Sequence, residues 1–241
     1  DNMGLCVAIH GNWAMAGLPY DDTLAINTGS LVQFDLSGPS PGTPIRFLLH
    51  PSPTTGDQFG GAAAMSGTRF IVGASLDDIG TLNAGSAYVY DLASPSPDFP
   101  IVSLHNPSPT NGDEFGRSVA IAGNWVAVSA QFADTAGVND AGRVYIYNLT
   151  SATPATPVMT LDNPEPATSD QFGNALALSG SRLVVGVKLD DALALNSGSA
   201  YIYNLEGATP TVPTHTLRNP TPAAQDFFAH AVAISLDQVV V

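Results

Sequence analysis

Residues 57–66 read Asp-Gln-Phe-Gly-Gly-Ala-Ala-Ala-Met-Ser, and this motif of an acid, an aromatic residue and a glycine before small apolar residues decides the fold. Its first four residues return at intervals of 56 or 57 residues along the chain. A fixed period of this length predicts a chain built from repeats of one supersecondary unit. The copies are Asp1-Asn2-Met3-Gly4, Asp57-Gln58-Phe59-Gly60, Asp113-Glu114-Phe115-Gly116, Asp170-Gln171-Phe172-Gly173 and a decayed Asp226-Phe227-Phe228-Ala229.

The motif also sets the repeat boundaries. There are four full repeats, at residues 1–56, 57–112, 113–169 and 170–225, and a partial repeat at residues 226–241. The third repeat is one residue longer, which we attribute to Asp140. The last repeat stops within a run that would be a buried strand, whose ladder bonds would be left unmet. We therefore expect the chain to be part of a longer polypeptide, or to be completed by neighbouring chains.

Each repeat contains four short apolar runs, which in the second and third repeats include residues 69–74, 85–92, 100–104 and 118–123. These runs are rich in Val, Ile, Tyr and Phe and are bounded by Gly, Pro, Asn and Asp, which predicts strands joined by hairpins. No stretch shows helical periodicity with caps. Four strands per repeat predict an all-β fold of four-stranded β-propeller blades, which must stack to bury their faces. Seven blades of this size would need roughly 390 residues.

The motif residues have predicted roles in this stacking. We expect the aromatic side chains to pack between blades, the glycines to allow close backbone approach, and the acids to cap a turn before the first strand. Trp13 and Trp125 follow the first turn, in places aligned with Phe70 and Leu183, and are therefore predicted to lie in the core. The motif residues concerned are Asp57, Phe59, Gly60, Asp113, Phe115, Gly116, Asp170, Phe172 and Gly173.

The charge balance narrows the range of partners. The chain has 7 Lys and Arg against 21 Asp and Glu, a formal net charge of −14. Such a surface repels the phosphates of nucleic acids and the headgroups of anionic membranes. No apolar run approaches the roughly 18 residues of a membrane-spanning helix. Cations, neutral sugars and basic protein surfaces remain compatible with an acidic surface of this kind.

The combined pattern resembles a known family. Asp-x-Phe-Gly, a Val-Val-Gly-Ala run, Asp-Asp, and then Asn-x-Gly-Ser-Ala-Tyr-Val-Tyr together resemble the bacterial FG-GAP repeat family, which is related to the blades of the integrin alpha-subunit propeller. The resemblance covers residues 1–241 and implies a β-propeller, commonly seven-bladed, in a secreted or cell-surface protein. Integrin-type repeats carry a calcium loop between their first two strands, which is replaced here by tight turns such as residues 66–68 and 179–181.

Paired acids follow the second run of each repeat. Oxygen ligands at this spacing suit Ca²⁺, which makes calcium the one cofactor that the sequence suggests. The alternative is that the Asp and Asn side chains fold these loops through bonds to the backbone. The candidate calcium ligands are Asp21, Asp22, Asn27, Asp77, Asp78, Asn83, Asp134, Asn139, Asp140, Asp190, Asp191 and Asn196.

No catalytic constellation stands out, because a Gly-x-Ser-x-Gly elbow, a phosphate loop and a Cys/His pair are all missing. Five histidines are present, and we align His50 with His105 before the Pro-rich turn. The sequence therefore predicts a non-catalytic recognition, adhesion or scaffold module that binds a protein or glycan through loops on one rim. A structural component of a surface layer or filament, and a part of a carbohydrate-active enzyme, remain as alternatives.

Overall fold

Strands form where the sequence alternates between side chains that face opposite sides of a sheet. In the third strand of the second repeat, Tyr88 and Tyr90 pack in one cluster with Phe59 and Phe70, whereas Ala87 and Val89 are also buried but belong to the other face. Along this face, the rings of Phe70 and Tyr90 stack with centroids 5.0 Å apart. Both faces of the central strands are thus buried.

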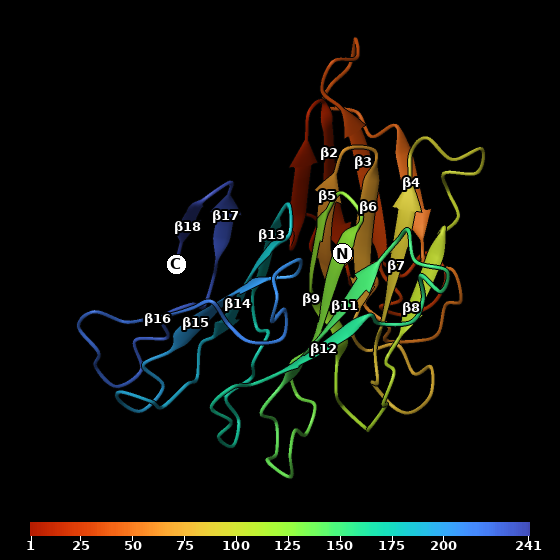
Figure 1. Ribbon diagram of the computed structural model, residues 1–241. Helices are drawn as coiled ribbons and strands as arrows, with labels where there is room; N and C mark the ends of the chain where they lie inside the picture. Colours follow the sequence, from red (N-terminus) through yellow and green to blue (C-terminus); the bar gives the residue numbers. More distant parts are fainter. The chain divides into compact units, whose positions relative to one another are not determined.

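The structure, a computed structural model, describes all 241 residues. It contains strands and no helix, and the strands form four antiparallel sheets of four consecutive strands and one sheet of two strands (Figure 1). The predicted all-β fold of four-stranded blades is confirmed. The chain divides into two compact units, Asp1–Val119 and Ala120–Val241, with the boundary inside strand β9.

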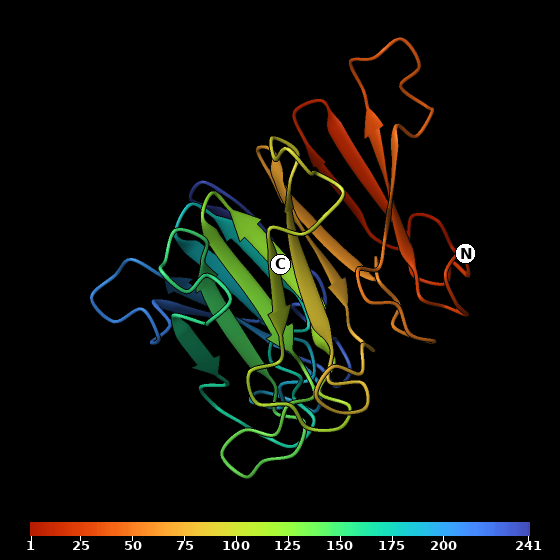
Figure 2. The same ribbon diagram turned by 90° about the vertical axis from the view of Figure 1, so that its right-hand side faces the viewer.

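Unit 1 contains two complete sheets, in the orders β1-β2-β3-β4 and β5-β6-β7-β8. Each sheet lies within one sequence repeat. Figure 2 shows the strands of each sheet running side by side, with the connecting loops at the two ends of the sheet. The strands are β1 (Val7–His10), β2 (Trp13–Leu18), β3 (Ser30–Asp35), β4 (Arg46–Leu49), β5 (Ala62–Ser66), β6 (Arg69–Ala74), β7 (Ser86–Asp91) and β8 (Val102–His105).

Unit 2 contains the sheet β13-β14-β15-β16, the two-stranded sheet β17-β18 and most of the sheet β12-β11-β10-β9. Its core is a cluster that includes Phe172, Leu183, Tyr201 and Tyr203. The strands are β9 (Phe115–Ala122), β10 (Trp125–Ala130), β11 (Arg143–Asn148), β12 (Met159–Asp162), β13 (Leu176–Ser179), β14 (Arg182–Val187), β15 (Ser199–Asn204), β16 (His215–Arg218), β17 (Ala233–Ser235) and β18 (Gln238–Val240).

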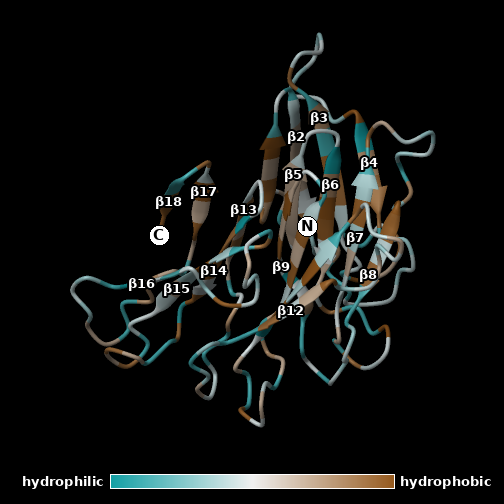
Figure 3. Ribbon diagram, in the orientation of Figure 1, coloured by the Kyte–Doolittle hydropathy of each residue, from teal (hydrophilic) through white to brown (hydrophobic).

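The motif phenylalanines are fully buried hydrophobic core residues. Phe59 is fully buried in a cluster that joins Met15 and Leu31 of the first sheet to Phe70 and Tyr88 of the second. Phe115 and Phe172 are also fully buried. Figure 3 shows that the strands carry most of the hydrophobic residues, while short hydrophobic stretches also appear on several connecting loops.

The strand register corrects the prediction for the tryptophans. Trp13 and Trp125 each begin a second strand, opposite Asp35 and Asn148. Two arginines, Arg69 and Arg182, begin the equivalent strands of the other repeats, opposite Asp91 and Asn204. The tryptophans therefore replace these arginines and not the core residues Phe70 and Leu183. Both are only partly buried, as expected at a strand end where a long arginine also fits.

Candidate functional site

The candidate site consists of the loops between the second and third strands of each repeat, here named the acidic loops (residues 21–29, 77–85, 133–142 and 190–198), and of the buried acids beneath them. In unit 1, these loops connect β2 to β3 and β6 to β7. In unit 2, they connect β10 to β11 and β14 to β15. Equivalent loops in one unit leave the sheets at equivalent strand ends.

The first acid of each loop folds the turn that follows it. Oδ1 of Asp21 accepts the backbone N–H of Thr23 at 2.8 Å. The same bond joins Asp77 to Ile79 at 3.0 Å and Asp190 to Ala192 at 2.7 Å. In the third repeat, Ala133 takes this place, because its carbonyl oxygen accepts Gly142 N–H as the Asp77 carbonyl accepts Gly85 N–H.

The second acid closes the loop. Oδ1 of Asp78 accepts the N–H of Asn83 at 2.8 Å, and Asp22 and Asp191 make the same bond to residues five positions further on. The residue that donates its N–H adopts a left-handed backbone, with φ of 52° at Asn83. Asn and Asp tolerate that conformation better than most residues. These loops are therefore held by side-chain bonds to the backbone.

The third repeat corrects one detail of the sequence alignment. Asp140 has a φ of 52°, and its N–H donates to Oδ1 of Asp134 at 3.0 Å, so it occupies the place of Asn83. The bond spans six residues instead of five. The additional residue therefore lies between Asp134 and Asp140, and Asp140 itself is a regular member of the repeat.

The calcium hypothesis stays a prediction for these loops. Several of their carboxylate oxygens accept backbone or hydroxyl hydrogen bonds, and Oδ2 of Asp21, for example, accepts the Ser30 hydroxyl at 2.5 Å. No group of three or more His, Cys, Asp or Glu side chains has the arrangement needed to hold a metal ion. Backbone carbonyls and water are additional ligands that Ca²⁺ commonly uses.

The acidic loops also expose aliphatic side chains, which the sequence reading missed. Three of the four loops carry two such side chains each, close to the exposed second acid. The signal in the sequence was an apolar residue one or three positions before the left-handed Asn, or directly after the Asp-Asp pair, inside a loop that otherwise reads as polar. The exposed residues are Leu24, Ile26, Ile79, Leu82, Leu193 and Leu195.

Each acidic loop is bonded to the motif of the next repeat. In unit 1, Gly56 N–H donates to the Ile26 carbonyl at 2.9 Å, and Phe59 N–H donates to the Thr28 carbonyl at 2.9 Å. Gly29 and Phe59 form an isolated parallel bridge. The loops are consequently fixed to the neighbouring sheet along their backbone, which makes them a rigid platform for the side chains that they expose.

Beneath the loops of unit 1 lies a buried polar cluster, here named the unit 1 junction (His50, Asp57, Asp77 and Tyr88). His50 Nε2 lies 3.4 Å from Oδ2 of Asp77, and His50 Nδ1 lies 3.8 Å from Oδ2 of Asp57. The Tyr88 hydroxyl donates to Oδ2 of Asp77 at 2.8 Å. The Ser52 N–H donates to His50 Nδ1 at 3.1 Å, so the neutral imidazole carries its proton on Nε2 and directs it toward Asp77.

The two carboxyls of this junction have opposite pKa shifts. Burial raises the pKa of Asp57, and the hydrogen bonds from Thr54 only partly oppose this. Burial also acts to raise the pKa of Asp77, but the interactions of its carboxylate with His50, Tyr88 and Ser86 outweigh burial, and the pKa is lowered. Asp57 accepts the N–H and hydroxyl of Thr54, at 2.5 and 2.6 Å, and so holds the turn before the motif.

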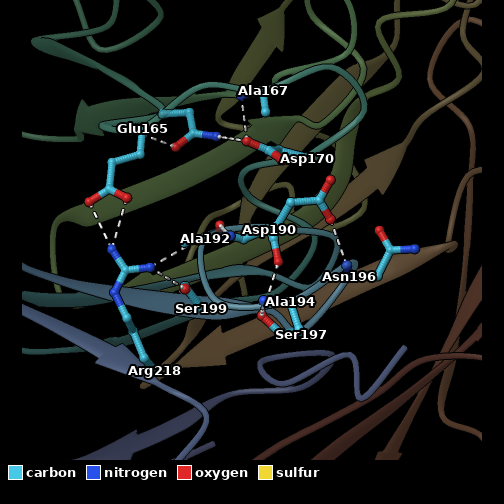
Figure 4. A network of polar contacts seen from close by, with 12 residues as sticks. Glu165, Ala167, Asp170, Asp190, Ala192, Ala194, Asn196, Ser197, Ser199 and Arg218 are labelled. Carbon is cyan, nitrogen blue, oxygen red and sulfur yellow. Dashed lines mark hydrogen bonds and ion pairs between the residues drawn. The ribbon is translucent and has the colours of Figure 1, made fainter. Parts of the chain in front are cut away.

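Unit 2 contains an equivalent cluster, the unit 2 junction (Asn163, Asp170, Asp190 and Tyr201), and Figure 4 shows Asp170 and Asp190 of this cluster. Asn163 Nδ2 and Ala167 N–H donate to Oδ2 of Asp170 at 2.8 and 2.7 Å. At the edge of the cluster, Arg218 binds both carboxylate oxygens of Glu165 at 2.8 Å. Burial, with added repulsion from Asp190 and Asp191, raises the pKa of Asp170 to about 6.

These contacts correct the alignment of the histidines. His50 accepts the N–H of Ser52, as Asn106 accepts the N–H of Ser108 and Asn163 accepts that of Glu165. His50 therefore replaces the asparagine of the other repeats. His105 lies one position earlier in its repeat, at the end of β8, where its Nδ1 contacts the Ser86 hydroxyl at 2.9 Å.

Comparison with family models identifies the repeat. The model described as FG-GAP repeat matches residues 50–90, 104–147 and 158–203, which together make up more than half of the chain. The chain belongs to the FG-GAP repeat family. Each matched span includes the Asp-x-Phe-Gly motif, the acidic loop and most of the third strand of one repeat. No curated protein matches the chain.

Membership of the FG-GAP family carries two general properties. FG-GAP repeats form β-propeller modules that often serve binding or adhesion, and they are typical of extracellular proteins. The structure has no helix of the length and apolar character that a membrane span needs. In this FG-GAP protein, the turn between the first two strands is short, as between Ser66 and Arg69.

Proposed function

We propose that this FG-GAP repeat protein is a secreted or cell-surface recognition module, without catalytic activity, that binds a protein ligand through its acidic loops. The observation that carries the proposal is the repeated pair of exposed aliphatic side chains beside an exposed aspartate. In unit 1, Leu24 and Ile26 accompany Asp22, and Ile79 and Leu82 accompany Asp78. Exposed apolar side chains that gather in one place are typical of interaction surfaces.

The loop composition favours a protein over a glycan. Residues 21–29, 77–85 and 190–198 contain no aromatic residue on which a sugar ring would stack. Aliphatic side chains framed by carboxylates instead complement a partner surface with apolar side chains and Lys or Arg. The net charge of −14 would also accelerate the encounter with a basic partner, and it does so most at low salt.

Parallel binding assays on a glycan array and on an array of basic, apolar peptides test this proposal. We expect binding on the peptide array that weakens with salt and is lost in the double variant Leu24→Ser/Ile26→Ser. Ile45→Ser is the matched control, because Ile45 is similarly exposed but lies just before β4, outside the acidic loops. Binding to glycans alone would contradict the protein-ligand proposal. Equal binding by Leu24→Ser/Ile26→Ser and by Ile45→Ser would also contradict it.

A structural role, as a component of a surface layer or filament, remains the second candidate function. A component of a surface layer would assemble without a soluble ligand, so absence of binding on both arrays together with ordered assembly would favour it. Turnover of a polysaccharide by the chain, abolished by replacing a single acid, would favour the carbohydrate-active enzyme instead. Calcium in the acidic loops is tested by titration of Ca²⁺ into chelator-treated protein, with Asp78→Asn as the variant that weakens a loop site.

A further inference from the structure

The two junctions place the same pair of buried acids in different surroundings. Asp57 and Asp77 of unit 1 correspond to Asp170 and Asp190 of unit 2 in the repeat. In unit 1, the imidazole of His50 lies within 3.8 Å of both carboxylates. In unit 2, the equivalent residue is Asn163, which donates to Asp170 and has no recorded contact with Asp190. The larger, protonatable side chain is thus absent from unit 2.

Three oxygen atoms of the unit 2 junction are left without hydrogen-bond partners. They are Oδ1 of Asp170, Oδ2 of Asp190 and the hydroxyl of Tyr201. Their residues are only 1%, 4% and 1% exposed, so water does not solvate them freely. A buried charged group without a partner is costly, and in proteins such groups are normally paired or coordinate a metal ion.

The neighbouring arginine balances this charge only in part. Arg218 is bound to Glu165 through two hydrogen bonds, and its Nη1 lies 3.8 Å from Oδ2 of Asp190, beyond hydrogen-bond distance. Figure 4 shows this ion pair at one side of the junction, with Asp170 and Asp190 in the middle. The two buried aspartates therefore have no hydrogen bond from a cationic side chain.

We propose that the unit 2 junction binds a hard inorganic cation between Asp170 and Asp190, with the Tyr201 hydroxyl as a further oxygen ligand, in the place that the His50 imidazole fills in unit 1. Carboxylate and hydroxyl oxygens are ligands for hard cations such as Ca²⁺, Mg²⁺ or Na⁺. The His50 side chain shows that the equivalent position in unit 1 has room for an additional group within 3.8 Å of both carboxylates.

A cation bound between Asp170 and Asp190 would relieve the repulsion between the two carboxylates and stabilise the folded unit.

The experiment uses the full chain with Trp13→Phe, which leaves Trp125 as the sole tryptophan and reports on unit 2. Chelator-treated protein is unfolded by heat in CaCl₂, MgCl₂, NaCl or KCl, with choline chloride at equal ionic strength as the reference. A cation that binds only the folded state raises the midpoint, by roughly 5–10 °C at about 100 times its Kd. Comparison of the four salts identifies the ion.

Two variants place the effect in the junction. Asp190→Ala should abolish the cation-dependent rise of the unfolding midpoint. The third repeat already has an alanine, Ala133, at this position. Asn163→His, which introduces the His50 arrangement, should raise the midpoint without added cation and remove the response to it. Asn106→His in unit 1 is the matched control and should leave the response unchanged.

The proposal is overturned if no salt raises the midpoint above choline chloride, or if Asn163→His responds to the cation as the parent protein does. If low pH stabilises the protein and no cation does, a proton on one of the two aspartates neutralises the unit 2 junction. That result would also overturn the cation proposal. Isothermal titration of the parent and of Asn163→His measures binding directly, so the result does not depend on the folding of Asp190→Ala.

Discussion

Gly85 shows how a single backbone position sets the spacing between repeats. Its φ is 85°, and a Cβ added there would overlap the carbonyl oxygen of Phe115. Gly29, Gly142 and Gly198 face the motif of the following repeat in the same way. The glycine before each third strand therefore serves two purposes, because it allows a left-handed backbone and it leaves room for the next motif.

Gly85→Ala and Gly112→Ala separate these two effects. Gly112 has a similar φ of 82°, but an added Cβ would find no atom within 4 Å. We expect Gly112→Ala to cost only the backbone strain of about 1–2 kcal/mol. Gly85→Ala adds a collision with the backbone and should cost roughly 3–5 kcal/mol in all. Urea unfolding followed by Trp13 in a Trp125→Phe background measures both, and equal costs would contradict the packing argument.

His50 is the second residue whose replacement is informative. His50→Ala leaves Asp57 and Asp77 buried without the imidazole between them, and should destabilise unit 1 by roughly 2–4 kcal/mol. His50→Asn restores the donor that binds the motif aspartate in the other repeats, as Asn106 binds Asp113 at 2.7 Å, so it should recover part of the loss. Urea unfolding followed by Trp13 measures both variants. A smaller cost for alanine than for asparagine would contradict this role.

Asp170 makes the stability of unit 2 depend on pH. Its folded pKa of about 6 lies above the ordinary value of 3.8, so the stabilisation from its protonated form is complete below about pH 4 and is lost as the pH rises through about 6. In chelator-treated protein, Asp170→Asn should reduce the fall in stability between about pH 4 and about pH 7 by roughly 1–2 kcal/mol. Trp125 fluorescence in urea reports the change.

The control for that measurement lies in the same unit. Asp226 occupies the same repeat position and accepts Asn219 Nδ2 at 2.7 Å, but it is exposed. Asp226→Asn removes one carboxyl without removing a buried charge. An equal change of the pH profile in the two variants would attribute the effect to net charge and not to the unit 2 junction.

At the scale of strands and loops, the sequence predicted the strands, because they depend on the local pattern of apolar residues. The alternating apolar runs predicted the strands, and the third strand of the second repeat is buried on both faces, as at Tyr88 and Val89. The equivalence of Trp13 to Arg69 and of His50 to Asn106 depends instead on strand register and on side-chain bonds, which residue type does not reveal. Alignment by chemical similarity paired tryptophan with phenylalanine and histidine with histidine, and was wrong in both cases.

The candidate site could be predicted only in part, because residue type does not reveal which side chains meet in the folded chain. Asp-Asp pairs at a fixed repeat position were visible in the sequence, and their bonds to loop N–H groups agree with the turn-forming alternative. The junctions were not predicted, because His50 and Asp77 are 27 positions apart and meet only after the first two sheets pack. Exposure of Leu24 or Leu82 likewise depends on the loop conformation.

Replacing Asp78 tests whether its bond to Asn83 N–H holds the acidic loop of residues 77–85. Asp78→Ala removes the acceptor of Asn83 N–H and should cost about 0.5–1.5 kcal/mol, because the donor it releases is near the surface and water replaces part of the bond. Asp78→Asn keeps an acceptor oxygen and should cost less. Hydrogen exchange at the Asn83 amide measures the local effect, and unchanged protection in Asp78→Ala would show that this bond does not hold the loop.

At the scale of the whole chain, repeats stabilise one another because each sheet has two apolar faces and needs a neighbour on each side. The first sheet presents an apolar row made of Val7 and Ile9, which point to the same face of β1, and of Met3 and Leu5 on the turn before it. Unit 1 has a hollow lined by residues including Val7, Ile9, Ala14 and Phe34. The exposed residues of the row are Met3, Leu5, Val7 and Ile9, at 56%, 58%, 71% and 66% exposure.

We therefore expect the 241-residue chain to associate in solution through this row, because a contiguous exposed apolar surface favours contact with another such surface. Sedimentation velocity over a range of concentrations should show a mass that rises above that of one chain. The double variant Val7→Ser/Ile9→Ser should shift the equilibrium toward the single chain. Phe99→Ser is the control, because Phe99 is 70% exposed but lies on the loop between β7 and β8. A chain that stays monomeric at every concentration, or an equal effect of Phe99→Ser, would contradict association through the first sheet.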